Sequence, residues 1–272
     1  MNSVPARYHG VWNRLSLRDA DGSLDTETRV LWLQTGSLYC DLRVPADRPD
    51  MDGARCLEDL DDAQLQLLAA QQGFAGMLQV EHDICRWHRH LDYQPDSGRA
   101  DVGRMRFAGG LLVEDGVHAN YREHWQRLDG SDGDLAALEL LGESDGTGEL
   151  CARGGCLVVS GDYFMFALGR TCMLPPAPSL AEAIERERYP RERVLQLLDF
   201  EISFGRRRGG AVPWEIQLST LPFREGRPLL VPETAPMHRD GPRWCQAAVD
   251  PRSAVARTWL AHHCPPDFRW FD

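Results

Sequence analysis

The sequence Tyr8-His-Gly-Val-Trp12-Asn-Arg14-Leu15 returns near the middle of the chain as Tyr121-Arg-Glu-His-Trp125-Gln-Arg127-Leu128. Both segments read Y-x-x-x-W-x-R-L, and they begin 113 positions apart. A period of this length is typical of two copies of a whole domain rather than of a stack of short units. We therefore expect two domains, over residues 1–117 and 118–272.

Each half also repeats an order of expected elements. Residues Thr28–Pro45 form two strand-like runs around Thr35-Gly-Ser37, and Cys156–Arg170 form a matching pair around Ser160-Gly-Asp162. In both halves a segment with helical spacing follows the hairpin, and strand-like segments follow the helix. The expected helices lie at 57–72 and 179–188, and the expected later strands at 74–89, 103–107, 111–114, 194–204 and 214–223.

Two stretches of the second half have no counterpart in the first. Residues 129–148 are rich in Gly and Asp and are interpreted as an insertion. After a strand-like piece near Arg243, we expect a C-terminal helix over about Ser253–His263. Many short strands separated by turn residues favour a barrel or a sandwich.

The segment Gly10-Val-Trp12 resembles the G-x-W signature of lipocalins and of the wider calycin group. In that group the tryptophan closes one end of an up-and-down barrel, and an arginine packs on it. The resemblance implies that the fold is all-β with short helices, as two tandem lipocalin-like barrels. It also implies a structural, barrel-closing role for four residues: Trp12, Arg14, Trp125 and Arg127.

This resemblance extends over nearly the whole chain. The pattern is similar to bacterial proteins of unknown function built from two lipocalin-like barrels. It is also similar to a fungal cytosolic protein that interacts with a casein kinase. The second copy of the signature departs from the family pattern, because Glu123 stands where Gly10 stands in the first.

Composition excludes several functions. A net charge of −11 argues against binding to nucleic acid or to an anionic membrane. All 30 basic residues are arginine, and without lysine the chain cannot form a Schiff base, hold pyridoxal phosphate or build a Walker P-loop. The eight cysteines form no C-x-x-C pair, and the N-terminus has no apolar signal core. We expect a cytoplasmic protein without a cofactor.

The most polar expected strand runs from His82 to Tyr93. Strict alternation places His82, Arg86, His88, His90 and Asp92 on one face, and Asp83, Cys85, Trp87 and Leu91 on the other.

Two registers are open for this strand. In one, Cys85 and Trp87 point to the core and the histidines face water. In the other, Asp83 corresponds to Asp199 of the second half, and the histidine face points inward. A slip of one residue exchanges the two faces.

The spacing His88-x-His90 also suits two imidazole ligands of a metal ion. A third ligand would have to come from Asp92, His118 or His124. We expect no metal centre here.

Two further residue patterns bear on the contact between the domains. Tyr39, Asp41 and Arg43 alternate with apolar residues, which predicts an outward polar row or a row at the interface between the barrels. Residues 162–168 are apolar on both faces. That strand should be covered on both sides, by the other barrel or by a second copy of the chain in a homodimer.

The leading functional hypothesis is an intracellular protein that binds a small ligand in the first barrel. The ligand would be apolar or amphipathic, with an anionic form included, because barrels of about eight strands leave room for one small molecule. The expected ligand-binding residues are Arg86, Trp87, His88, His90 and Asp92.

Two alternatives stay open. One is an enzyme of the same shape that uses His88 or His90 as acid or base, with an arginine holding an anion. The other is a protein-interaction or scaffold protein with filled barrels. No G-x-S-x-G, G-x-G-x-x-G or H-E-x-x-H motif is present, so no catalytic residue is identified.

Overall fold

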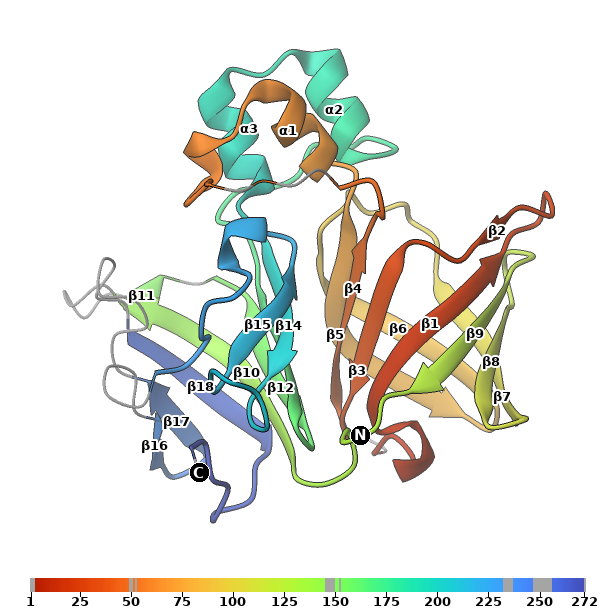
Figure 1. Ribbon diagram of the computed structural model, residues 1–272, viewed down its shortest axis with the longest axis vertical. Coiled ribbons are helices and arrows are strands. Elements are labelled where there is room, and N and C mark those ends of the chain that lie inside the picture. The colour runs from red at the N-terminus through yellow and green to blue at the C-terminus, as the bar shows by residue number, and fades with distance from the viewer. Residues whose placement is uncertain are drawn as a thin grey trace.

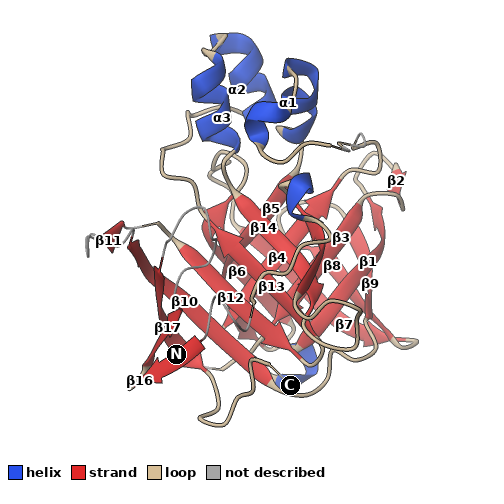
Figure 2. Cartoon of the chain, turned by 60° about the vertical axis from the view of Figure 1, so that its left-hand side comes forward, coloured by secondary structure: helices blue, strands red, loops and turns tan. Residues whose placement is uncertain are grey.

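The chain folds into two antiparallel β-sheets that lie against each other, with three α-helices gathered at one end (Figure 1). The computed structural model describes residues 3–48, 51, 53–144, 150–151, 153–231, 237–246 and 256–271. Figure 2 shows the helices lying beyond the ends of the strands rather than on a sheet face. The fold is all-β with short helices, as expected.

The first sheet closes into a barrel of eight strands in up-and-down order, because the last strand pairs with the first. A two-residue strand, β2, extends its edge beside β1. The strands are β1 (Gly10–Arg18), β2 (Leu24–Asp25), β3 (Arg29–Gln34), β4 (Leu38–Val44), β5 (Gln72–Glu81), β6 (Ile84–Asp92), β7 (Asp101–Ala108), β8 (Leu111–Gly116) and β9 (Arg122–Arg127).

The two copies of Y-x-x-x-W-x-R-L lie in the two strands that close this barrel. In the β1–β9 ladder Trp12 is opposite Arg127, and Arg14 is opposite Trp125. The second copy therefore ends the first barrel and does not open the second one. The first sheet runs to Arg127, past the expected boundary between residues 117 and 118.

The second sheet runs in the order β15-β14-β13-β12-β10-β18-β17-β16, with β11 beside β10. It curves around its own aromatic core, and we call it the second barrel. Its strands are β10 (Leu135–Ser144), β11 (Leu150–Cys151), β12 (Gly155–Ser160), β13 (Tyr163–Leu168), β14 (Glu201–Arg206), β15 (Glu215–Ser219), β16 (Met237–Asp240), β17 (Arg243–Gln246) and β18 (Ala256–His263).

Two expectations for the second half are wrong. The supposed insertion contains β10, a central strand that pairs with β12 and β18. The expected C-terminal helix is strand β18, in which Arg257 and Trp259 are buried between less buried neighbours. That period of two fits a strand, and its two partner strands supply the backbone hydrogen bonds. Residues 253–255 of the expected helix lie outside the described residues.

The helices follow the same hairpin in each half, so the architecture is duplicated. Helix α1 (Asp62–Leu68) lies between β4 and β5, and α2 (Leu180–Glu187) and α3 (Arg191–Leu198) lie between β13 and β14. Asp61 and Gln64 form a capping box that starts α1. Helix α3 occupies the beginning of the expected strand 194–204. Single 3₁₀ turns are η1 (Ala6–Tyr8), η2 (Leu57–Asp59) and η3 (Pro222–Arg224).

The largest hydrophobic core lies between the barrels, where the outer faces of β3 and β4 meet β12, β13 and β14. Cys40 and Leu42 of β4 enter this core, whereas Tyr39 and Asp41 point into the first barrel. Neither expectation for this polar row is therefore correct.

Strand β13 is covered on both sides, as predicted. Met165 and Ala167 face the core between the barrels, and Phe164 and Phe166 face the interior of the second barrel.

Candidate functional site

A β-bulge decides the register of β6, the polar strand. Trp87 pairs with Leu78 and Arg89 with Gly76 in one register, which then shifts by one residue so that Leu91 pairs with Ala75. His90 is the extra residue. Gly76 permits the bulge, because a Cβ atom there would lie 1.9 Å from the carbonyl oxygen of His88.

The bulge moves Asp92 onto the inner face, which Trp87 already occupies. Trp87 points into the first barrel, as in the register with a buried tryptophan, and Arg86 and His88 are exposed on the outer face. After the bulge Asp92 pairs with Phe74, which belongs to the barrel core, so Asp92 turns inward. Placing Asp92 on the histidine face is therefore wrong. Strict alternation fails because it takes no account of an inserted residue.

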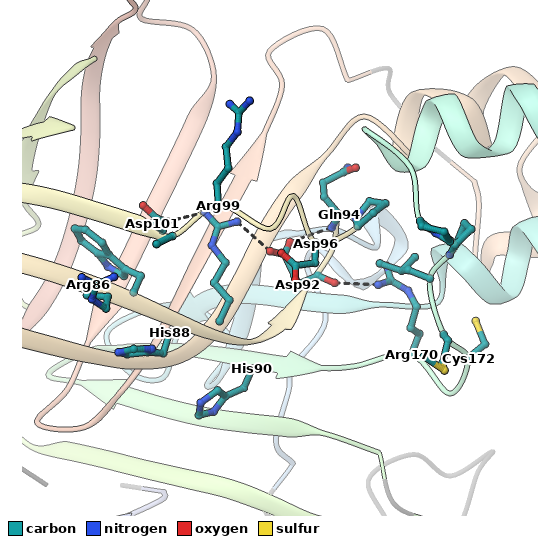
Figure 3. Close-up of a pocket in the computed structure, with 18 residues that line it drawn as sticks. Arg86, His88, His90, Asp92, Gln94, Asp96, Arg99, Asp101, Arg170 and Cys172 are labelled. Atoms are coloured by element: carbon teal, nitrogen blue, oxygen red, sulfur yellow. Dashed lines mark hydrogen bonds and ion pairs between the residues drawn. The ribbon is translucent and has the colours of Figure 1, made fainter. Parts of the chain in front are cut away.

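All five predicted ligand-binding residues nevertheless line one groove of about 690 Å³ at the mouth of the first barrel (Figure 3). The groove opens where β6 and β7 separate, since their pairing ends at Trp87–Asp101. The other walls are the loop before β7 and residues 170–176 of the second half. The site therefore lies at the barrel mouth, against the second barrel, and not in the lumen.

Arg89 bridges the gap between β6 and β7. Its guanidinium lies 2.9 Å from Asp92 and 2.6 Å from Asp101, and 3.6 Å from the ring centroid of Phe74. Burial raises the pKa of Asp92, and Arg89 offsets part of that effect. Arg89 thus separates the groove from the barrel interior. Arg89 is not among the expected ligand-binding residues, although strict alternation with Trp87 already places it on the inner face.

Arg170 holds the opposite wall in place. Its guanidinium donates to the carbonyl oxygens of Asp92, Tyr93 and Leu197 at 2.9 to 3.0 Å and stacks over Phe200. Burial lowers the pKa of Arg170. This arginine ties the loop of the second barrel to the end of β6, so hydrogen bonds join the two walls of the groove.

Two other arginines carry the free positive charge of the groove. Within the described residues, neither Arg86 nor Arg99 has an ion-pair partner. His88 contacts the side-chain oxygen of Gln79 at 3.2 Å. On the same rim Met173 is 87% exposed, an unusual exposure for an apolar side chain. Cationic and apolar groups thus surround one hollow.

A second cleft, of about 940 Å³, lies on the other side of His88 and His90, which line both hollows. His9, His262 and His263 also line it, so five of the nine histidines of the chain meet there. His262 lies 2.6 Å from Glu139, and burial lowers the pKa of His9. In the part of the chain that is described, no group of three or more His, Cys, Asp or Glu could hold a metal ion.

Packed side chains occupy the interior of both barrels. In the first, Trp32 lies 5.8 to 6.2 Å from the rings of Trp12, Trp87 and Trp125. In the second, the rings of Phe164, Phe166, Trp214, Trp244, Trp259 and Trp270 fill the same region. A ligand deep in either lumen would have to displace these rings.

The four residues expected to close barrel ends meet across the β1–β9 ladder. The Arg127 guanidinium lies 4.7 Å from the Trp12 ring, and the Trp12 indole donates to the Tyr8 carbonyl at 2.8 Å. Arg14 instead forms ion pairs with Glu123 at 2.9 Å and Asp25 at 2.5 Å. Trp125 packs edge-on against Trp32 inside the barrel.

The fold and the groove define an all-β protein of two packed barrels with a polar cleft between them. No protein-family model matches the chain, and no curated protein does. Among solved structures the chain is similar to the uncharacterized protein YLR301w from Saccharomyces cerevisiae, with a TM-score of 0.54 and 13% identity. The match covers 93% of this chain and 98% of the yeast chain, and at this identity it shows the fold alone.

No helix in the described residues is both long enough and apolar enough to cross a membrane.

Proposed function

We propose that the protein binds a small amphipathic anion in the groove at the mouth of the first barrel. The observation that carries this proposal is the pair Arg86 and Arg99, two guanidinium groups without ion-pair partners among the described residues, on one concave surface. Guanidinium groups bind carboxylate and phosphate in bidentate geometry. The groove volume of about 690 Å³ is within the usual range for small-molecule sites.

The apolar part of the ligand would lie against Trp87 and the rim formed by Met173 and Leu174. These side chains border the same groove as the two arginines. Met173 gains most from such a contact, since it is 87% exposed without a ligand. Arg89 is less suited to hold the anion, because Asp92 and Asp101 already neutralise it.

Calorimetric titration with octanoate tests the proposal, with octanol as the matched neutral probe and octyl phosphate as the second anion. We expect the two anions to bind and octanol to bind at least about tenfold more weakly, since one charge-assisted hydrogen bond contributes about 1.5–3 kcal/mol. Equal affinity for octanoate and octanol would contradict an arginine site.

Variants locate the binding. Arg86→Gln and Arg99→Gln should each weaken octanoate binding by about tenfold. The matched control is Arg104→Gln, since Arg104 is an exposed arginine of β7 that pairs with Asp83 and does not line the groove. A loss of affinity in the control equal to that in the groove variants would mean that only net charge matters.

A protein-interaction role is the second candidate, and the filled interiors of both barrels favour it. In that case the exposed rim around Met173 would contact another protein. If no anionic probe binds and none changes the melting temperature, the protein-interaction role is the candidate that remains.

The enzyme alternative with His88 or His90 stays a prediction. No carboxylate contacts either imidazole within the described residues.

We also propose that the first barrel belongs to the calycin group and that the chain is similar to the fungal protein that interacts with a casein kinase. The support is the closed eight-strand barrel with Gly10-Val-Trp12 on its first strand and Arg127 stacked on Trp12. Superposition of the first barrel alone on lipocalins tests this: Trp12 and Arg127 should fall on the family's tryptophan and arginine.

A further inference from the structure

Two buried thiols from different barrels touch in the core between the sheets. Cys40 on β4 and Cys156 on β12 place their sulfur atoms 3.3 Å apart. Cys40 is fully buried, and Cys156 is 5% exposed. This is the one contact between cysteine sulfurs in the described part of the chain.

We infer that Cys40 and Cys156 are an oxidation site, at which a peroxide converts the two thiols into a disulfide that locks the two barrels together. The sulfur atoms need to approach by about 1.3 Å to reach the S–S bond length. Because both side chains already point at each other from facing sheets, this approach needs a small shift of two strands and no change of fold.

The chemistry balances with hydrogen peroxide as the two-electron oxidant. One thiolate attacks a peroxide oxygen, the O–O bond breaks, and a first water leaves after protonation, which gives a sulfenic acid. The second thiolate attacks that sulfur, the S–O bond breaks, and a second water leaves. The sum is two thiols and one peroxide giving one disulfide and two waters.

Burial sets the rate of this step. A thiolate is the reactive species, and burial raises the pKa of the Cys40 thiol well above its usual value. Oxidation therefore has to wait for the core between the barrels to open, or has to occur before the barrels dock. We expect the bond to form slowly in the folded protein and faster during refolding.

The absence of lysine makes the product simple to map. Trypsin cleaves this chain only after arginine, and it releases residues 30–43 with Cys40 and residues 154–170 with Cys156, each with a single cysteine. The full-length protein is treated with hydrogen peroxide in native buffer and, in a second arm, during refolding from denaturant. We expect an intact mass lower by two hydrogens and a cross-linked pair of these two peptides that reduction separates.

Crosslinking should also raise the melting temperature by at least about 5 °C, because the bond closes a long loop. Cys40→Ala and Cys156→Ala should abolish the crosslinked peptide. Cys172→Ala is the matched control, because this half-buried thiol lies outside the pair and its loss should leave the crosslink intact.

Recovery of both peptides as free thiols in both arms would overturn the inference. So would a crosslink that maps to other cysteines. The peptide map of the peroxide-treated wild-type protein tests the inference even if an alanine variant does not fold.

Discussion

Two corresponding strands, β6 of the first barrel and β15 of the second, show what the duplicated architecture keeps and what it changes. Trp87-His-Arg-His-Leu91 and Trp214-Glu-Ile-Gln-Leu218 share the pattern W-x-x-x-L. In both, the register shifts opposite a glycine, Gly76 in the first barrel and Gly205 in the second. Both tryptophans enter a barrel core, and both leucines face the core between the barrels.

The residue that follows the tryptophan on the inner face differs in kind. In the first barrel it is Arg89, which bridges two aspartates, and in the second it is Ile216, which is fully buried among aromatic rings. The fold thus accepts a charged or an apolar interior at the same position. A charge at this position needs acidic partners, and among the described residues only the first barrel supplies them. For this reason the proposed ligand site is the one beside the charged copy.

Of the two exchanges between Arg89 and Ile216, we expect the one in the second barrel to lower the stability more. Ile216→Arg buries a charge among rings that offer it no acid, and we expect a loss of at least about 4 kcal/mol in the free energy of unfolding. Urea denaturation at pH 7 measures it. Ile216→Leu is the size-matched control and should lose less than about 1.5 kcal/mol. An arginine variant as stable as the leucine variant would show that this interior is open to water.

The substitutions Gly76→Ala and Gly205→Ala test whether the two barrels share the bulge. A Cβ atom at Gly76 would lie 1.9 Å from a carbonyl oxygen, and one at Gly205 would lie 2.1 Å from another. We expect each variant to lose about 3 kcal/mol, since backbone must move in both. Gly22→Ala is the control, because nothing lies within 4 Å there and only its positive φ costs stability, about 1 kcal/mol. If only one barrel is affected, the two bulges are not equivalent.

The reverse exchange, Arg89→Ile, should be milder. It leaves Asp92 and Asp101 without their guanidinium, but about a third of the Arg89 side chain is exposed, so water compensates in part. We expect a loss of about 1–3 kcal/mol and a groove open to the barrel interior. Faster quenching of tryptophan fluorescence by acrylamide would report that opening. No change in stability or quenching would contradict a plugging role.

Local alternation and turn residues are enough to predict the hairpins and the all-β class. The interpretation of the Y-x-x-x-W-x-R-L pair as the start of each domain was wrong, since pairing between Trp12 and Arg127 depends on closure of the barrel and leaves no local signal. Strand β18 was mistaken for a helix for a similar reason: its partners lie far away in the sequence.

The ligand-binding role of Arg86, Trp87, His88, His90 and Asp92 stays a prediction, and the structure adds how these side chains are arranged. All five line one groove, but the bulge at His90 places Asp92 on the inner face with Trp87 rather than on the histidine face. The repeat W-x-x-x-L would have revealed the correct match between the halves. An ungapped match of Asp83 to Asp199 is wrong, because β6 corresponds to β15 and Asp199 precedes β14.

A last difference between the interiors is the carboxylate pair Glu114 and Glu123, which stand opposite each other on β8 and β9 and are almost fully buried. Glu123 binds Arg14, whereas Glu114 accepts from the hydroxyl of Tyr121 at 2.7 Å. Burial raises the pKa of Glu114 well above its usual value, and the charge of Glu123 raises it further. The folded state therefore holds a proton on Glu114 that the unfolded chain releases above about pH 4.5.

The sign of the pH dependence follows from that proton. A raised pKa in the folded state gives stability that is complete below about pH 4.5 and is lost as the pH rises towards the folded-state pKa. Glu114→Gln keeps a neutral acceptor for Tyr121 and has no proton to lose, so at pH 7 it should be more stable than the wild type by about 1–2 kcal/mol. The gain should shrink as the pH falls to about 4.5. Glu123→Gln, which removes a partner of Arg14, should instead lose stability at pH 7. A Glu114→Gln difference that is constant with pH would mean that Glu114 is not the protonated member of the pair.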